Sequence, residues 1–412
     1  MISYFIVFMY IKRELEETIK PYLHRKEIIA IIGPRQVGKT TLVKHLLKSF
    51  NKTNSITFED IKTKNLFEQN IDAFIELHVK NYDYLFIDEV QYSKTSGKQL
   101  KYIYDTQKIK IIVSGSSASE LSIRSLKYLV GRVLIYNLYP FSFLEYLEHK
   151  NPKLKKLLIK NNIKGLEFEF NKLLDEYILY GGYPEVVIAS NEEEKELVLK
   201  NIYNTYFLKE IKEIFQLKDD YKISVLLKTL SLQISNIINY QSLSELSGLS
   251  IQEVKNKINV FEKTFLIIRS KNFHTNKRTE LKKSPKIFFI DTGFRNIAIN
   301  NFSKERTDQG ALYENFIAQE LIKKEFEIKF WRTQSKAEVD FVLEKNGKII
   351  PIEVKTIHNK LSLGKSYISF IEQYKPKKGF LFSLNFVNER KVNNSSIYFK
   401  KLVEIINIKK LI

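Results

Sequence analysis

The chain has 412 residues, more than one hydrophobic core usually organises, so we expect two or three domains. Its hydrophobic content of 44% and aromatic content of 13% support packed cores and argue against an intrinsically disordered chain. Its 67 Lys and Arg residues outnumber 47 Asp and Glu, and this net charge of +20 favours polyanionic partners such as DNA, although a solvated Lys-rich surface is the simpler alternative.

The chain contains no cysteine, which excludes disulfides and thiolate metal sites and fits a reducing, cytoplasmic location. Residues 1–10 are apolar but too short for a membrane span of about 20 residues, and no other stretch is typical of one, so we expect no membrane partner. For these first residues we expect an added strand, a membrane-touching tip or an upstream start codon ahead of Met9.

Residues 11–145 alternate helices with short apolar strands, which predicts a parallel sheet covered by helices and hence an α/β fold. The predicted strands are Ile28–Ile32, Ile56–Glu59, Tyr84–Ile87, Ile109–Val113 and Val133–Asn137.

A glycine-rich loop follows the first of these strands and precedes a helix. Its sequence fits GxxxxGK[ST], the pattern of a P-loop, in which backbone N–H groups and a helix N-terminus surround phosphate oxygens. Lys39 is then expected to reach the β- and γ-phosphates of ATP, and the Thr40 hydroxyl to ligate magnesium. The residues assigned to nucleotide binding here are Gly33, Pro34, Arg35, Gln36, Val37, Gly38, Lys39, Thr40 and Thr41.

Two acids end the third predicted strand. Asp88 is expected to hold magnesium through water at the sheet edge, and Glu89 to polarise the water that attacks the γ-phosphate; a surface acid is the alternative for Glu89. The fourth strand ends in hydroxyl residues, of which Ser116 is our first choice for contacting the γ-phosphate and Ser114 the second. A simple strand-ending turn is the alternative for these serines.

Several motifs in chain order resemble AAA+ ATPases of bacteria and archaea that carry a C-terminal domain of unknown function. The motifs are GPRQVGKTT, FIDEVQ, SGSS, GRV, PFSFLEY, YGGYP and IDTG. The resemblance covers about residues 11 to 400, and it implies a P-loop AAA+ domain that binds and hydrolyses ATP with Mg²⁺.

AAA+ enzymes often complete catalysis with an arginine from a neighbour or a sensor position. Arg132, in the GRV motif, and Arg124 are the candidates, and each could equally be a surface ion-pair partner. An arginine that acts in trans would require a homo-oligomer.

Residues 146–240 have apolar side chains at helical spacing, which predicts a helical lid or linker. Residues 241–300 predict a winged-helix-like region, with a helix, a turn at Gly248 and a second helix over Ile251–Thr264. The second helix presents Lys255, Asn256, Lys257 and Asn259 on its polar face.

The expected wing strands are Leu266–Ser270 and Lys286–Ile290. Residues 271 to 286 contain six Lys or Arg against one Glu, which favours DNA contact. A structural lid without DNA contact is the alternative.

Residues 301–412 predict a C-terminal α/β domain with a helix over Ala311–Phe326 and a hairpin that turns at Asn346-Gly347. Within the return strand Glu353 and Lys355 are two apart and share a face, and Asp340 can meet them across the pair. Carboxylates and a lysine together predict a magnesium site that acts on phosphate esters.

This order of residues resembles the PD-(D/E)xK nuclease fold, as in archaeal Holliday-junction resolvases. The residues that match the pattern are Glu314, Asp340, Glu353 and Lys355, and Gln373 is a candidate accessory residue. Val339 stands where the pattern has a proline. A domain that keeps the fold for binding only, or an ordinary surface hairpin with an ion pair, is the alternative; Trp331 and Arg332 are expected to contact DNA or to pack.

Together these features predict a DNA-directed ATPase with a nuclease-like C-terminal domain, whose metal ligands would be Thr40, Asp88, Asp340 and Glu353. The alternative is an NTPase signalling switch, in which the C-terminal domain binds a protein partner and does not cleave DNA.

Overall fold

The computed structural model describes residues 10–116, 127–205, 221–274, 280 and 283–412. These residues form two compact units. The described part of the first unit ends at Phe141, and the second unit begins at Ser142. The sequence-based division placed the end of the first domain at residue 145 and cut the remainder at 240 and 300. In the structure residues on both sides of position 300 share one sheet, so the described residues from Ser142 onwards form a single unit.

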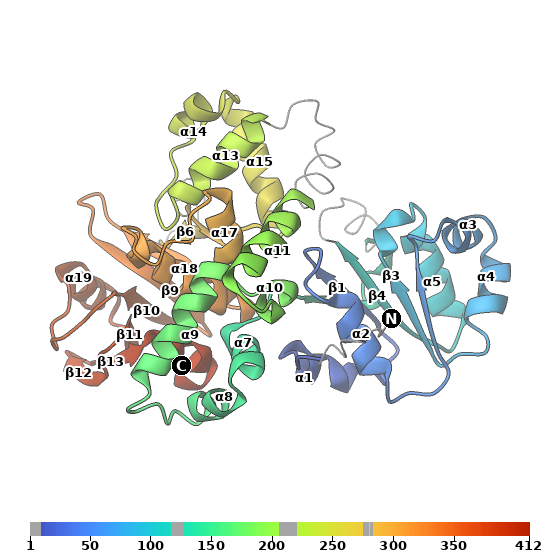
Figure 1. Cartoon of the computed structure of the whole chain (residues 1–412), viewed down its shortest axis with the longest axis horizontal. Helices are drawn as coiled ribbons and strands as arrows, with labels where there is room; N and C mark the ends of the chain where they lie inside the picture. The colour runs from blue at the N-terminus through green and yellow to red at the C-terminus, as the bar shows by residue number, and fades with distance from the viewer. Residues whose placement is uncertain (1–9, 117–126, 206–220, 275–279, 281–282) are drawn as a thin grey trace. The chain divides into compact units, whose positions relative to one another are not determined.

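The first unit contains a five-stranded parallel sheet in the order β2-β3-β4-β1-β5 (Figure 1). Its strands are β1 (Ile28–Gly33), β2 (Thr53–Thr57), β3 (Tyr84–Asp88), β4 (Lys110–Ser116) and β5 (Val133–Asn137). Its helices are α1 (Leu15–Ile19), α2 (Lys39–Leu47), α3 (Ile61–Gln69), α4 (Ile71–His78) and α5 (Ser96–Thr106). The predicted α/β class and parallel sheet are confirmed.

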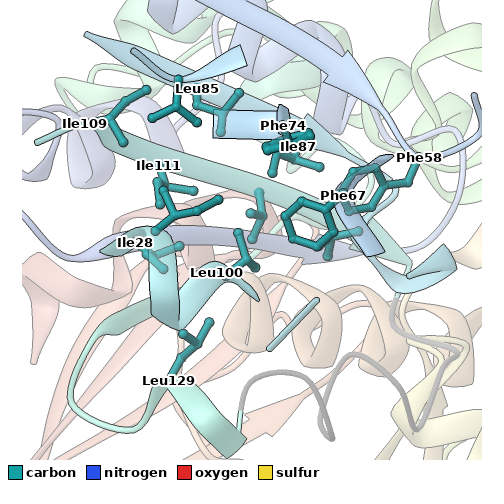
Figure 2. Close-up of a cluster of buried hydrophobic side chains, with 14 of the residues drawn as sticks. Ile28, Phe58, Phe67, Phe74, Leu85, Ile87, Leu100, Ile109, Ile111 and Leu129 are labelled. Atoms are coloured by element: carbon teal, nitrogen blue, oxygen red, sulfur yellow. The ribbon is translucent and has the colours of Figure 1, made fainter. Parts of the chain in front are cut away.

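An apolar cluster fixes the sheet of the first unit against its helices. Figure 2 shows Phe67 and Phe74 of the helical segments beside Ile87 of β3, all fully buried. Burial of each such side chain contributes about 1.5–3 kcal/mol to the stability of the fold. This packing stabilises the sheet whose strand ends carry the predicted site residues.

Two strands differ from their predicted bounds. Strand β2 begins at Thr53, before the predicted Ile56, because it is a half-exposed edge strand whose polar residues give no apolar run. Strand β4 extends to Ser116, three residues beyond its predicted end at Val113, because it stays paired with β1 until Ser116 lies opposite Gly33.

The second unit opens with helices, as predicted. They are α7 (Phe143–Lys150), α8 (Pro152–Ile159), α9 (Glu167–Tyr180), α10 (Pro184–Ile188), α11 (Glu192–Thr205) and α13 (Tyr221–Leu232). Ser142 caps α7 with a capping box in which Glu145 returns the hydrogen bond, and this fixes where the helix begins.

A helix-turn-helix follows, formed by α14 (Tyr240–Ser247) and α15 (Ile251–Lys263). Gly248 ends α14 with a φ of 66°, and Ser250 caps α15. Strands β6 (Ile267–Asn272) and β7 (Lys286–Phe289) then form an antiparallel pair, as the prediction of two wing strands required.

The second unit also contains an eight-stranded sheet in the order β12-β13-β11-β10-β9-β8-β6-β7. Its later elements are α17 (Thr292–Ala298), α18 (Gln309–Lys323), β8 (Lys329–Arg332), β9 (Glu338–Lys345), β10 (Lys348–Val354), α19 (Lys365–Tyr374), β11 (Lys378–Ser383), β12 (Asn388–Val392), β13 (Ser395–Lys401) and α20 (Ile408–Leu411). The β9–β10 turn has Asn346 at φ 50° and Gly347 at φ 72°, as an Asn-Gly hairpin requires. Strand β6 pairs with β8, so the two strands that were expected to form a wing belong to the C-terminal sheet.

The YGGYP and IDTG motifs pack against each other. Asp291, which begins α17, accepts a hydrogen bond from Gly182 N at 2.7 Å. A Cβ on Gly181 would lie 2.1 Å from Asp291 Oδ1, and one on Gly293 would lie 2.1 Å from Tyr180 O. These glycines are therefore required by close packing between α9 and α17, which gives both motifs a structural role.

Candidate functional site

The phosphate loop joins β1 to α2 in the first unit, as predicted. Gly33 is required at its start, because a Cβ there would lie 2.1 Å from Leu138 O. Gly38 caps α2 with a φ of 89°, a conformation that favours glycine, and Gln36 also has a positive φ of 62°. These backbone conformations form the tight turn through which the loop leads into the N-terminus of α2.

Lys39 lies in the first turn of α2 with its side chain folded over the loop. Its Nζ donates to Gly33 O at 3.0 Å and to Pro34 O at 2.8 Å, and only 5% of the residue is exposed. The ammonium group is thus held against the loop, and the same group can bind phosphate oxygens there.

Asp88 ends β3 beside this loop. Its Oδ2 accepts a 2.5 Å hydrogen bond from Thr40 Oγ1, its Oδ1 accepts one from Ser114 Oγ, and Glu89 N donates to Oδ1 at 3.0 Å. The structure therefore brings together Thr40 and Asp88, two of the four predicted metal ligands. A hydroxyl and a carboxylate are the oxygen donors that magnesium prefers, so this donor set fits the ion.

Glu89, the predicted catalytic acid, is connected to Ser116 through Gln91. The Gln91 amide donates to Glu89 Oε2 and to Ser116 Oγ, the latter at 3.4 Å. A Cβ on Gly115 would lie 2.6 Å from Gln91 Oε1, so glycine leaves the space for this amide. The sequence analysis assigned no role to Gln91, although it lies two residues after Glu89.

The remaining loop residues differ in exposure. Pro34 and Val37 are buried, whereas Gln36 and Thr41 are exposed. Arg35 Nη2 donates to Tyr92 OH at 3.2 Å, so the structure places its guanidinium beside the segment that follows β3.

Arg13 is a residue of this site that sequence reasoning missed. It is 4% exposed, its Nη1 donates to Val37 O at 2.8 Å, and its Nη2 donates to Tyr139 O at 2.6 Å. Its guanidinium also lies 4.7 Å from the centre of the Phe141 ring. Arg13 therefore connects the phosphate loop to the segment after β5, and no local motif around it could have indicated this.

Arg132 lies away from the phosphate loop of its own chain. Its backbone oxygen accepts from Ile28 N at the start of β1, whereas the loop follows the end of that strand. Its Nε lies 2.9 Å from Asp105 Oδ1. Within one copy the structure thus brings Arg132 to the opposite edge of the sheet, and Arg124 lies outside the described residues.

The helix-turn-helix exposes part of its predicted polar face. Lys255 and Asn256 of α15 are exposed, and Val254, Ile258 and Phe261 are buried. Asn259 instead accepts a 2.6 Å hydrogen bond from Arg269 Nη1, which reduces its availability for other contacts.

The predicted basic wing differs from expectation at Lys286. This lysine begins β7, is 2% exposed, and lies 2.5 Å from Glu338 Oε1 and 3.8 Å from Glu314 Oε2. It therefore contributes to a buried ion-pair cluster and not to an exposed basic surface. Lys277, Arg278 and Lys282 lie outside the described residues.

The predicted nuclease-like residues meet in the second unit. Strands β9 and β10 pair up to Phe341 and Ile352, so Asp340 and Glu353 follow at the next opposed positions. Val354 N donates to Asp340 Oδ2 at 2.8 Å, and Lys355 Nζ lies 2.7 Å from Glu353 Oε1. Helix α18 supplies Glu314 to this cluster, as the ion pair with Lys286 requires.

Burial and mutual repulsion shift the carboxylates of this cluster. Burial, followed by the charge of Asp340, raises the pKa of Glu314 well above its usual range and that of Glu353 to about 8. Burial likewise raises the pKa of Asp340. Burial alone would lower the pKa of Lys286, but the surrounding carboxylates outweigh it and raise that pKa.

A divalent cation would satisfy oxygens that this cluster leaves without hydrogen bonds. Glu314 Oε2 and Glu353 Oε2 are buried and have no hydrogen-bond partner. Asp340 and Glu353 therefore fit the role of metal ligands in their chemistry. In the described part of the chain, however, no group of three or more His, Asp or Glu side chains is arranged to hold a metal ion.

Three further residues that the sequence analysis named for this domain are Trp331, Arg332 and Gln373. Trp331 is 3% exposed and packs edge-on against Phe370, so it belongs to the core. Arg332 Nη1 donates to Glu338 Oε2 at 3.0 Å, and Gln373 is exposed on α19. Among the described residues, no helix is long and apolar enough to cross a membrane.

Three family models match the chain. Residues 25–147 match an AAA domain, which covers the five-stranded sheet and the phosphate loop. Residues 171–305 match a domain of unknown function (DUF8612), and residues 309–404 match another (DUF4143). The first unit thus contains an AAA-type domain, as predicted.

The chain is also similar to proteins of other organisms. An uncharacterized protein of Haemophilus influenzae is 25% identical over 349 residues, 79% of this chain and 82% of its own. An uncharacterized protein of Methanocaldococcus jannaschii is 28% identical over 345 residues, 81% of this chain and 75% of its own. A solved structure of RuvB from Thermotoga maritima aligns at 15% identity with a TM-score of 0.29, covering 65% of this chain and 91% of that one.

Proposed function

We propose that the first unit binds ATP with magnesium and hydrolyses it. The observation that carries this proposal is the convergence of Lys39, Thr40 and Asp88 at one edge of the sheet. Lys39 would bind the β- and γ-phosphates, while Thr40 and Asp88 would hold the magnesium ion, which neutralises charge on the phosphates. Glu89 would orient the attacking water, with its side chain held by Gln91 until substrate enters.

Lys39→Ala tests this proposal. We expect it to remove ATP turnover, measured as phosphate release, because it deletes the ammonium group that is held against Gly33 O and Pro34 O of the loop. Lys44→Ala, on the same helix, is the matched control and should retain turnover. Turnover in a purified Lys39→Ala protein would refute the proposal.

The second unit, in this proposal, acts on DNA. Three observations support DNA as the partner: the net charge of +20, the exposed Lys255 and Asn256 on the second helix of the helix-turn-helix, and the PD-(D/E)xK-like acid cluster. Phosphate contacts by lysines would give binding that weakens steeply with salt. Magnesium at Asp340 and Glu353 would supply charge neutralisation at a phosphodiester, with Lys355 beside it.

A second candidate is a switch that binds a protein partner and does not cleave DNA. The observation that favours it is the pairing of the cluster with Lys286 and Lys355, which already neutralises part of its negative charge.

Cleavage of linear, branched and single-stranded DNA with magnesium, with and without ATP, separates the two. Cleavage that is lost in Glu353→Ala would support the nuclease-like function. Tight ATP binding without cleavage of any substrate would support the switch.

A further inference from the structure

Lys286 occupies an unusual place for a lysine on a wing strand. Its ammonium group is buried between Glu338 and Glu314 and lies 5.5 Å from the centre of the Phe330 ring. Its strand, β7, pairs with β6, which in turn pairs with β8 of the C-terminal sheet. The fold thus delivers a cation from the winged-helix-like region into the acid cluster.

Carboxylates that lie this close together repel one another when they are ionised, so the acid cluster requires positive charge nearby if its acids are to be ionised in the folded protein. Four carboxylates gather there, Glu314, Glu338, Asp340 and Glu353, against two ammonium groups, Lys286 and Lys355. Lys355 contacts Glu353 and the Arg332 guanidinium contacts Glu338, whereas Lys286 contacts both Glu338 and Glu314. A fixed ammonium repels a divalent cation that enters within a few ångströms, because the screening there is weaker than in water.

We propose that Lys286 is a positioning residue that serves as the built-in counter-ion of the acid cluster and competes there with a divalent cation. This inference rests on the proposed nuclease-like role of the cluster, because only that role requires a metal ion. Metal binding then requires Lys286 to withdraw from Glu314.

Mn²⁺ binding to the full chain without nucleotide tests the proposal. Free Mn²⁺ is measured by electron paramagnetic resonance during a titration of wild type, Lys286→Gln and Lys348→Gln. Lys348 is an exposed residue of β10, so its variant makes the same change in net charge away from the cluster. We expect Lys286→Gln to bind Mn²⁺ on the order of tenfold more tightly than wild type, and Lys348→Gln to match wild type.

Removing Lys286 alone leaves Glu338 with Arg332 as its remaining ion-pair partner and can destabilise the second unit. A pair of variants avoids this difficulty: Glu338→Gln is compared with Lys286→Gln/Glu338→Gln, in which the ion pair is removed as a whole. Thermal unfolding verifies that each protein is folded. The proposal requires tighter Mn²⁺ binding by the double variant than by Glu338→Gln.

A lysine that only stabilises the fold would give a different result, because its removal would leave the Mn²⁺ affinity unchanged or reduce it. Equal affinities of the folded Glu338→Gln and double variants would therefore overturn the proposal. Tighter Mn²⁺ binding without cleavage of any DNA would support the counter-ion role and refute the nuclease activity. Cleavage by wild type, with an Mn²⁺ affinity that does not depend on Lys286, would support the activity and refute the counter-ion role.

Discussion

Asp88 in the first unit and Asp340 in the second are both carboxylates on sheet strands, each 9% exposed, but their neighbours differ. Asp88 accepts hydrogen bonds from the neutral hydroxyls of Thr40 and Ser114. Asp340 accepts one backbone hydrogen bond and lies among other carboxylates and two lysines. Neutral hydrogen-bond donors thus stabilise the Asp88 carboxylate, whereas the charges of neighbouring carboxylates and lysines determine the environment of Asp340.

This difference has a consequence for metal binding. Neutral donors stabilise a carboxylate without cancelling its charge, so the site around Asp88 keeps a net attraction for magnesium. The buried ammonium group of Lys286 and the exposed one of Lys355 cancel part of the negative charge around Asp340, which lowers the attraction of that cluster for a cation. Under the proposals made above, the first site would accept a metal ion directly, and the second would require a rearrangement of Lys286.

Asp88→Asn should have the largest effect and sharpen the comparison. We expect ATP turnover to fall below detection, because the amide cannot replace the charge that holds magnesium. Asp340→Asn should leave turnover within about twofold, because it lies in the other unit. Phosphate release in the presence of magnesium measures both, and similar losses in the two variants would contradict the separation of the sites.

Arg132 tests whether the first site is complete within one copy. If the arginine serves a neighbouring copy, Arg132→Ala and Lys39→Ala should each be inactive and should regain turnover when they are mixed, since each supplies what the other lacks; such arginines contribute about a thousandfold. Full activity of Arg132→Ala alone would instead assign Arg132 to its ion pair with Asp105.

Arg13→Met should have an intermediate effect on the first site. Loss of the hydrogen bonds to Val37 and Tyr139 would loosen the phosphate loop, and we expect ATP affinity to fall about tenfold, with partial recovery in Arg13→Lys. Arg25→Met, an exposed arginine over Tyr22, is the matched control. Binding is measured with a fluorescent ATP analogue, and an unchanged affinity in a folded Arg13→Met protein would remove this role.

Glu353→Gln should give the smallest effect, visible as a dependence on pH. Burial raises the pKa of Glu353 from 4.5 to about 8, so the folded chain binds a proton that the unfolded chain has released. The resulting stability is fully present below pH 4.5 and is lost as the pH rises through 8.

The free energy of unfolding of wild type minus that of Glu353→Gln should therefore fall between about pH 5 and pH 8, by on the order of 2 kcal/mol. Denaturant unfolding at a series of pH values measures it. A difference that stays constant, or increases with pH, would show that the proton is not held in the folded state.

Local sequence patterns were sufficient for much of this molecule. The P-loop motif, the acids after Tyr84–Ile87 and the Asn346-Gly347 turn each depend on a few consecutive residues, and the structure contains all three elements. The start of strand β2 was predicted wrongly because this edge strand lacks a run of apolar residues. The wing was misjudged at Lys286, since a lysine carries no local sign of whether it will meet water or buried acids.

The sequence by itself determined which chemical groups are present and where helix caps and tight turns lie, because propensity, capping and turn geometry act over a few residues. Only the tertiary structure decided which groups meet. It brought Arg13 to Val37 and Tyr139, moved Arg132 away from the phosphate loop, and joined Lys286 to Glu314. Such contacts depend on the order of strands in the sheets, which is set by packing between segments far apart in the chain.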